Sequence, residues 1–477
     1  MLKNILFFLS VAFCQSLFAG PVESNLSVAL NEIKNLNSDN CEAVLIKIQK
    51  NFENIQESHY LRIEAEAGVE SLRAQLFLFR EELRKQIRKN IPCAKPIKEA
   101  LISARALEDL TGLYGYKDRQ LEFEKVNFNN QPVPLKNRTA YHSHHGSKEV
   151  NFNSGDIMIT KGISYTSSAI STLPIPSSLF SHIVFVHVDQ GTQAASTFES
   201  YIGSGASIYK MDDALKNENI RILVLRQSDA DLAKKADEYM TGRFTEAKRS
   251  GRQIPYDYEM DFNDNSKLSC EEIAYDAYKV ASEGQFVLPA FLSYNSRNRV
   301  SIMESMGLKK GEIMMPADME SDPRFEVVYD WTDFRFVRDS WRKDAILSEI
   351  FRWMDDLNYQ FKTHLFDVPR NAFLLTRYVP GLSWVFNKIQ KIDSDLPNSA
   401  ILAKLNIQTV GEILMQKLKN SDEIHFNKTG LWMSQKQLRN SLEKIRLQDL
   451  AKHRTPEQSS TFHDYISNQP PAYKIGR

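Results

Sequence analysis

One cysteine stands in a setting that could make it a nucleophile. Cys270 lies in the string Ser269-Cys270-Glu271-Glu272, which precedes apolar residues at helical spacing. A serine with a glutamate three residues later forms a capping box, which predicts a helix starting at Cys270. The free N–H groups of a helix N-terminus favour a thiolate and can hold an oxyanion. Cys270 is therefore a candidate nucleophile, and a structural cysteine beneath a helix start is the alternative.

A nucleophilic thiol needs a base, and the chain has 10 histidines to supply one. His182 opens the run 182–188, which has the apolar pattern of a strand and follows a loop rich in Pro and Ser. His187 lies five residues further on, so it faces the other side of the same strand. We take His182 as the candidate base, with a structural strand histidine as the alternative.

A carboxylate that could orient His182 is found by counting across a predicted hairpin. If Gln190-Gly191 is a two-residue turn, opposed residues add to 190 + 191 = 381, and 381 − 182 = 199 is a glutamate. Directly opposed residues share a face, with Cβ atoms about 5 Å apart. Glu199 is therefore the predicted partner of His182. A slip of one residue would move it to the other face, and a solvent-facing glutamate is the alternative.

The first 19 residues have the pattern of a secretory signal peptide. Lys3 precedes an apolar run over 5–13, and Ala19-Gly20 offers a cleavage point. No later run of 18 apolar residues is free of charges, and the closest stretch, 371–389, is interrupted. We expect an exported protein, periplasmic or secreted, with no transmembrane segment after signal removal.

Export affects how the cysteines are interpreted. Cleavage would remove Cys14 and leave Cys41, Cys93 and Cys270. An odd number of cysteines in an oxidising compartment indicates one bridge and one free thiol. Cys41 and Cys93 lie in one predicted helical region, so we pair them in a disulfide, which leaves Cys270 free.

Composition excludes several classes of protein. Hydrophobic residues make up 42% of the 477 residues and charged residues 25%, which is the mix of a folded globular protein. The 60 basic residues balance the 60 acidic ones. A nucleic-acid binder needs a basic surplus, so no nucleic-acid partner is expected.

Three blocks of different periodicity follow the signal peptide. Residues 21–125 carry apolar stripes at steps of three and four, which predict an N-terminal helical domain. Residues 150–340 contain short apolar runs, near 157–159, 182–188, 197–202 and 220–225, with two helices between them, one from Asp229 to about Gly242 and one from about Ser269. Residues 341–477 return to helical periods. The middle block therefore predicts an α+β fold flanked by helical regions.

The order of these motifs resembles the circularly permuted papain-like cysteine hydrolases, NlpC-type enzymes of the YiiX/YebB/YaeF kind. The resemblance covers about residues 150–330 and rests on five short strings, which are Ser154-Gly155-Asp156-Ile157, Ser181-His182, the strand with Glu199, Tyr256-Asp257 and Cys270-Glu271-Glu272, together with the segment 311–318. It implies a catalytic set of Cys270 as nucleophile, His182 as base and Glu199 as orienting residue. Tyr256 and Asp257 would contact substrate beside the helix, with structural roles as the alternative.

Two departures from the family pattern concern the substrate more than the chemistry. Glu271 stands where family members usually carry a serine, and the segment 242–255 is longer and more basic. The resemblance implies an exported cysteine hydrolase that cleaves amide bonds of cell-wall peptides through a thioester. A lipid esterase or acyltransferase, with the apolar run 286–292 as an acyl-lipid wall, and a non-catalytic scaffold are the alternatives.

No metal or cofactor is expected. His142, His144 and His145 form the nearest approach to a metal site, but they lack cysteine or carboxylate partners at ligand spacing. The predicted reaction needs a thiol, a base and a carboxylate, all of which the chain supplies.

Overall fold

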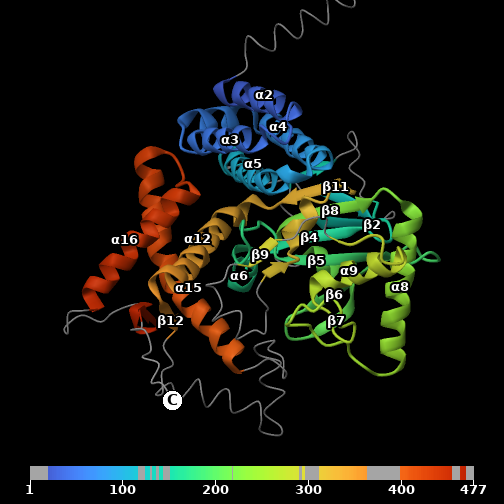
Figure 1. The fold of residues 1–477 in the computed structure, drawn as a ribbon. Coiled ribbons are helices and arrows are strands. Elements are labelled where there is room, and N and C mark those ends of the chain that lie inside the picture. Colours follow the sequence, from blue (N-terminus) through green and yellow to red (C-terminus); the bar gives the residue numbers. More distant parts are fainter. Residues whose placement is uncertain are drawn as a thin grey trace, which may run out of the picture. The chain divides into compact units, whose positions relative to one another are not determined.

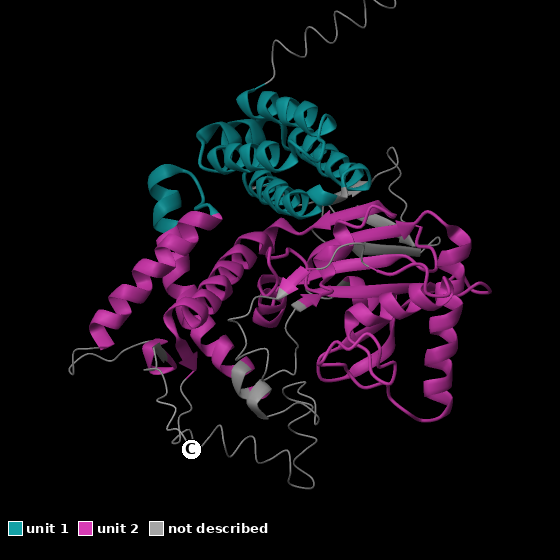
Figure 2. Cartoon of the chain, viewed as in Figure 1, with its two compact units in different colours: residues 1–121, 423–434 teal, residues 122–422, 435–477 magenta. Residues whose placement is uncertain are grey.

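The computed structural model describes residues 20–116, 124–128, 131–135, 139–142, 151–216, 219–288, 293–295, 311–361, 398–453 and 462–468. The chain forms two compact units (Figure 2). The first comprises residues 1–121 and 423–434, and the second comprises residues 122–422 and 435–477.

Four helices make up most of the described part of the first unit. They are α2 (Pro21–Lys34), α3 (Cys41–Gln56), α4 (His59–Lys89) and α5 (Ala94–Gly115), drawn in blue in Figure 1. Their predicted apolar stripes are buried, as at Leu45, Phe52 and Leu76. Helix α4 departs from helical geometry at Gly68, which has no side chain to restrain its backbone. The spacing of the buried apolar residues at steps of three and four explains why this region is helical, as predicted.

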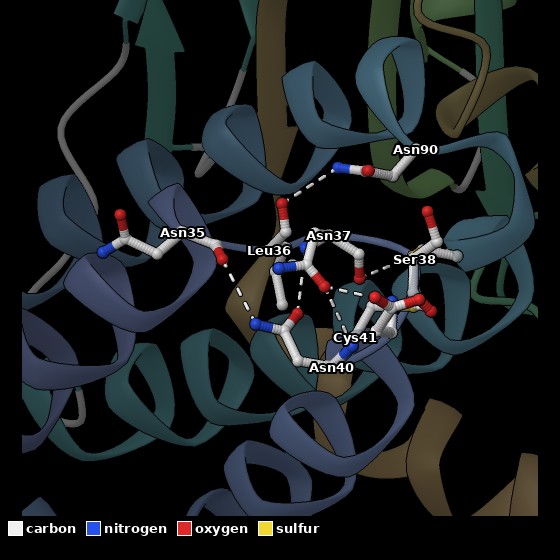
Figure 3. Close-up of a disulfide and its surroundings, with 9 residues drawn as sticks. Asn35, Leu36, Asn37, Ser38, Asn40, Cys41 and Asn90 are labelled. Atoms are coloured by element: carbon white, nitrogen blue, oxygen red, sulfur yellow. Dashed lines mark hydrogen bonds between the residues drawn. A yellow bond between two sulfur atoms is a disulfide. The ribbon is translucent and has the colours of Figure 1, made fainter.

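The predicted disulfide between Cys41 and Cys93 is confirmed. The bond joins the first residue of α3 to the short 3-10 helix η1 (Ile91–Cys93) across a sequence separation of 52. Asparagine side chains hold the connection between α2 and α3 beside it (Figure 3). Asn90 donates to the carbonyl of Leu36 at 3.1 Å, and Asn40 donates to that of Asn35 at 3.3 Å.

The second unit is built on an antiparallel sheet, which confirms the α+β class. In the described part of the chain its strands run in the order β3-β11-β8-β4-β5-β6-β7, and each neighbouring pair is antiparallel. Their bounds are Thr139–His142 (β3), Phe325–Thr332 (β11), Asn219–Gln227 (β8), Ile157–Gly162 (β4), His182–Val188 (β5), Ala195–Tyr201 (β6) and Gly205–Lys210 (β7).

Helices pack on this sheet at several places. Helix α9 (Cys270–Ala281) lies against β5 and β6, and α8 (Ala230–Arg249) lies against α9 (Figure 1). The other described helices of this unit are α6 (Tyr165–Thr172), α7 (Met211–Lys216), α11 (Pro316–Glu320), α12 (Phe334–Leu357), α15 (Asn398–Thr429, whose last turns belong to the first unit), α16 (Gln435–His453) and the 3-10 helix η2 (Phe462–Asp464).

Three small two-stranded pairs complete the described elements. They are β1 (Glu124–Phe128) with β2 (Gln131–Leu135), β9 (Ser293–Asn295) with β10 (Gly311–Ile313), and β12 (Tyr359–Phe361) with β13 (Ile466–Asn468). None of the helices in the described ranges is both long and apolar enough to span a membrane.

The predicted end of α8 near Gly242 was wrong, because the helix continues to Arg249. Phe244, beyond that glycine, is buried and stacks on Phe198 of β6 with ring centroids 4.7 Å apart. Burial of an aromatic ring against the sheet outweighs the helix-weakening effect of one glycine, which is about 1 kcal/mol.

The sheet core supports the strands that carry the candidate site. One buried cluster on the sheet includes Met158, Val184, Val186 and Val224 from three adjacent strands, with Trp331 of β11. The position of β4 is further fixed by Lys161, whose buried ammonium contacts Asp344 of α12 at 2.8 Å. The strand β5 is therefore held between well-packed neighbours at the point where His182 begins it.

Candidate functional site

Helix α9 begins at Cys270, as the capping box predicted. The Ser269 hydroxyl accepts a hydrogen bond from the Glu272 N–H at 3.3 Å, and the Glu272 carboxylate accepts one from the Ser269 N–H at 2.6 Å. Cys270 is 5% exposed and is a free cysteine. Its sulfur therefore lies at a helix N-terminus, in a nearly buried position.

The hairpin that carries His182 and Glu199 differs from the predicted one. Strands β5 and β6 pair Phe185 with Phe198 and Val188 with Ala195, so opposed residues add to 383 rather than 381. The connection is a longer loop in which the Asp189 side chain accepts hydrogen bonds from two backbone N–H groups and Gln193 has a positive φ of 58°. The predicted two-residue turn was wrong. The register differs by two residues, and an even shift leaves each side chain on its predicted face.

His182 and Glu199 are hydrogen-bonded. Their Nε2 and Oε2 atoms lie 3.0 Å apart. The β5–β6 pairs from Phe185 to Val188 fix a register that, continued to His182, places Tyr201 opposite it. Glu199 is then the diagonal neighbour of His182 on the same face. The pairing predicted by counting is therefore present as a diagonal contact.

Tyr201 adds two contacts that the sequence reasoning missed. Its hydroxyl donates to the same Oε2 atom of Glu199 at 2.5 Å, and its ring stacks on the His182 imidazole with centroids 4.7 Å apart. Thr197 donates to the other oxygen of Glu199 at 2.6 Å. Thr197, Glu199 and Tyr201 alternate along β6, and this run of polar residues on one face was a signal that could have found them.

The carboxylate of Glu199 is held in its charged form. Burial acts to raise the pKa of Glu199, but the hydrogen bond and charge of His182, with the hydroxyls of Thr197 and Tyr201, outweigh it and lower that pKa below its usual value. Glu199 thus provides a fixed negative charge, only 1% exposed, beside Nε2 of His182. The other ring nitrogen, Nδ1, points away from the Glu199 carboxylate. A thiol that passes its proton to the ring must lie on this Nδ1 side.

Cys270 lies in the same region as His182. The backbone N–H of Ile183, the residue after His182, acts to lower the pKa of the Cys270 thiol. The charge of His182 acts on Glu271, and the charge of Cys270 acts on Tyr201, whose ring stacks on the imidazole. The structure therefore joins His182 to Glu199 by a hydrogen bond and places Cys270 at the start of a helix that packs on the two strands carrying them.

The thiol of Cys270 does not have the lowered pKa that the helix N-terminus predicted. Burial raises its pKa well above the usual value, and the neighbouring Glu271 carboxyl raises it further. The N–H groups of Ile183 and of Cys270 itself act in the opposite direction and are outweighed. The surroundings of the sulfur therefore favour its protonated form.

Tyr256 and Asp257 lie in the segment that leads to α9. Tyr256 is partly buried, and burial together with the charges of Cys270 and Glu271 raises its pKa. Asp257 is 2% exposed and accepts hydrogen bonds from the N–H groups of Glu259 at 3.0 Å and Asp261 at 2.7 Å. Asp257 thus shapes its own loop, and the substrate contact expected of Tyr256 stays a prediction.

Two other strings of the predicted site have structural contacts. The Gly155 carbonyl accepts a hydrogen bond from Tyr278 at 2.6 Å, which ties the segment before β4 to helix α9. Asp156 pairs with Arg226 at 2.7 Å. Phe286, the described start of the apolar run, packs on Tyr278 and Phe325. Phe286 is partly buried, Val287 is 47% exposed and Leu288 is buried, so this part of the run is only partly core, and residues 289–292 lie outside the described ranges.

Within the described residues, no group of three or more His, Cys, Asp and Glu side chains is arranged to hold a metal ion. His144 and His145 lie outside the described ranges, as does the side chain of His142. The predicted signal peptide, 1–19, also lies outside them.

Comparison of the chain with models of known protein families gave no match, and none of the curated proteins matched it.

Proposed function

We propose that this protein is an exported cysteine hydrolase of the permuted papain-like kind, in which Cys270 attacks a carbonyl carbon. The observation that carries the proposal is the His182–Glu199 pair at 3.0 Å, with Tyr201 on the same carboxylate oxygen, next to a thiol at a helix N-terminus. A histidine held by a carboxylate beside a cysteine is the arrangement that activates a thiol for acyl transfer.

The proposed reaction proceeds in two halves. Nδ1 of His182 takes the thiol proton as the sulfur bonds to the carbonyl carbon, and the carbonyl electron pair moves to the oxygen. The Cys270 N–H, in the first turn of α9, donates to that oxyanion. Collapse breaks the bond to the leaving amine, which receives the proton from His182 and leaves a thioester. His182 then takes a proton from water, which attacks the thioester, and the released sulfur regains a proton.

Glu199 and Tyr201 act on the charge that develops on His182. The imidazole becomes positive in both halves, and the buried carboxylate at 3.0 Å stabilises it. Tyr201 holds Glu199 by its hydroxyl and the ring of His182 by stacking. Both residues fix the tautomer and orientation of the base.

The proposed substrate is an amide bond of cell-wall peptides. The predicted signal peptide and the Cys41–Cys93 disulfide support a location outside the cytoplasm, where such peptides occur. The ring of Phe286, at the start of the apolar run expected to form an acyl-lipid wall, is partly buried and packs on Tyr278 and Phe325. The proposed chemistry requires no metal or cofactor.

The test uses purified protein and its Cys270→Ala variant with two substrate sets, cell-wall peptide fragments and phospholipid vesicles. Products are identified by mass spectrometry. The proposal predicts peptide fragments cleaved at an amide bond by the wild type and not by the variant. Fatty-acid release that depends on Cys270 would show a lipid hydrolase instead, and inactivity on both sets, with an intact fold, would favour a scaffold.

A further inference from the structure

Tyr209 is an aromatic residue beside the candidate site that the proposed reaction does not use. It lies on β7, the last strand of the sheet order, and is partly buried. Its ring contacts that of Tyr201 on β6, with ring centroids 5.4 Å apart and an angle of 90° between the ring planes. This is an edge-to-face contact, one of the arrangements that aromatic pairs prefer. Tyr209 therefore touches the residue that stacks on His182.

The register of β6 and β7 explains how the two tyrosine rings meet. The directly opposed pairs are Thr197–Tyr209, Glu199–Ser207 and Tyr201–Gly205. Opposed residues share a face, so Tyr209 lies on the face that carries Glu199 and Tyr201. Ser207 is small and Gly205 has no side chain, so they leave room on this face. The long ring of Tyr209 can therefore lean along the strand as far as Tyr201.

The rings of His182, Tyr201 and Tyr209 form a continuous row. Tyr201 stacks on the imidazole with centroids 4.7 Å apart and ring planes at 21°. Its hydroxyl donates to Glu199 at 2.5 Å. That hydroxyl lies on the axis about which the tyrosine ring turns, and this rotation is only broadly restricted, so the hydrogen bond alone does not set the tilt of the ring. The contact with Tyr209 restrains the tilt, because an edge-to-face pair favours one relative orientation.

We propose that Tyr209 is a positioning residue, whose edge-to-face contact holds the ring of Tyr201 against the imidazole of His182. This role rests on the proposed function, because it takes His182 as the base. The base must keep Nδ1 directed at the thiol, and small errors in the geometry of reacting groups lower the rate strongly. Tyr209 acts through Tyr201 and takes no part in the proton transfers.

The first test compares kcat/KM for p-nitrophenyl acetate in variants of the full chain. Tyr209→Leu removes the ring, and we expect kcat/KM to fall about fivefold, which corresponds to about 1 kcal/mol for an aromatic pair. Tyr209→Phe keeps the ring and should stay within about twofold of the wild type. Tyr294→Leu is the control and should match the wild type, because Tyr294 is 47% exposed on β9. In a Tyr201→Leu background, Tyr209→Leu should have no further effect.

The second readout is the nuclear magnetic resonance signal of the His182 ring, which does not depend on activity. The protein is labelled in its histidines, and the His182 signal is identified by its loss in His182→Asn. Protons above the face of an aromatic ring are shielded, so the stack with Tyr201 moves this signal upfield. Tyr209→Leu should shift it in the same direction as Tyr201→Leu does, and Tyr209→Phe should leave it in place.

Unchanged kcat/KM or an unmoved His182 signal in a folded Tyr209→Leu protein would overturn the proposal. An effect of Tyr209→Leu that persists in full in the Tyr201→Leu background would overturn it as well, and would indicate that Tyr209 meets the substrate directly. Cys270→Ala is assayed alongside. Hydrolysis by this variant at the wild-type rate would refute the proposed function, and the His182 signal would then decide whether Tyr209 positions the imidazole.

A replacement is available if Tyr209→Leu does not fold, judged by circular dichroism. Tyr209→Val is then measured in the same way, because β-branched residues suit strands. If neither variant folds, the wild type decides. A nuclear Overhauser effect between the rings of Tyr201 and Tyr209 is expected, and its absence would contradict the contact on which the proposal depends.

Discussion

Replacement of Glu199 by glutamine isolates the charge that the site places beside His182. The change keeps the size and hydrogen-bonding capacity of the side chain. With its amide nitrogen at the place of Oε1, it can donate to the Thr197 hydroxyl, and with its amide oxygen at the place of Oε2 it can still accept from Tyr201 and His182. We therefore expect a folded protein that lacks the negative charge 3.0 Å from Nε2 of His182.

The magnitude follows from what the charge does in the reaction. The imidazole is positive in the transition state, so the wild type has an ion pair where the variant has a neutral contact. A buried hydrogen bond to a charged group contributes about 1.5–3 kcal/mol. At about 1.4 kcal/mol per factor of ten, kcat/KM should fall about 10- to 150-fold.

The assay is the release of nitrophenolate from p-nitrophenyl acetate, which reports acylation of the thiol without knowledge of the natural substrate. Glu238→Gln is the control, since Glu238 is 63% exposed on α8 and lies 3.7 Å from Lys234. Such a surface pair contributes little, so this variant should match the wild type. Unchanged kcat/KM in a folded Glu199→Gln protein would refute an orienting role for Glu199.

Three further predictions concern other contacts. Tyr201→Phe keeps the ring on His182 but loses the hydrogen bond to Glu199. For a bond of about 1 kcal/mol, kcat/KM should fall about fivefold. No change in the nitrophenolate assay would show that the hydroxyl does not contribute. The double variant Cys41→Ala with Cys93→Ala opens a loop of separation 52 and should lower the free energy of unfolding by about 4 kcal/mol in urea titrations, whereas an unchanged midpoint would count against the bond. The hydrogen bond to Asp237 raises the pKa of His187, so protonated His187 stabilises the fold fully below pH 6.5, the usual histidine pKa. This stabilisation is lost as pH rises through the raised pKa, and thermal melts of the wild type over this range should show the loss. The same loss in Asp237→Asn would contradict the assignment.

Local patterns predicted the elements of the site well. The capping box Ser269–Glu272 set the start of α9, and the run 182–188 matched β5 at both ends. The disulfide followed from counting cysteines in a chain that was expected to be exported. These features depend on a few adjacent residues or on composition, so the sequence contains the information directly.

Features that depend on several segments were harder to predict. The loop after β5 was misjudged because Asp189 and Gln193 form a longer turn than Gln190-Gly191 suggested. The contact of His182 with Glu199 was nevertheless predicted. Side chains on one face of a strand repeat every two residues, and the predicted register was wrong by two residues. The pKa direction of Cys270 was wrong, because burial and the Glu271 side chain act together and only the folded chain shows both.

The most direct test of the proposed nucleophile is a covalent one. The protein is mixed with p-nitrophenyl acetate, quenched in acid within the first turnover, and analysed by peptide mass mapping. We predict one acetyl group per chain, on the peptide with Cys270, that is removed by hydroxylamine and is absent from Cys270→Ala. Nitrophenolate release with the acetyl group on another residue, or at an equal rate in Cys270→Ala, would contradict the assignment of Cys270 as the nucleophile.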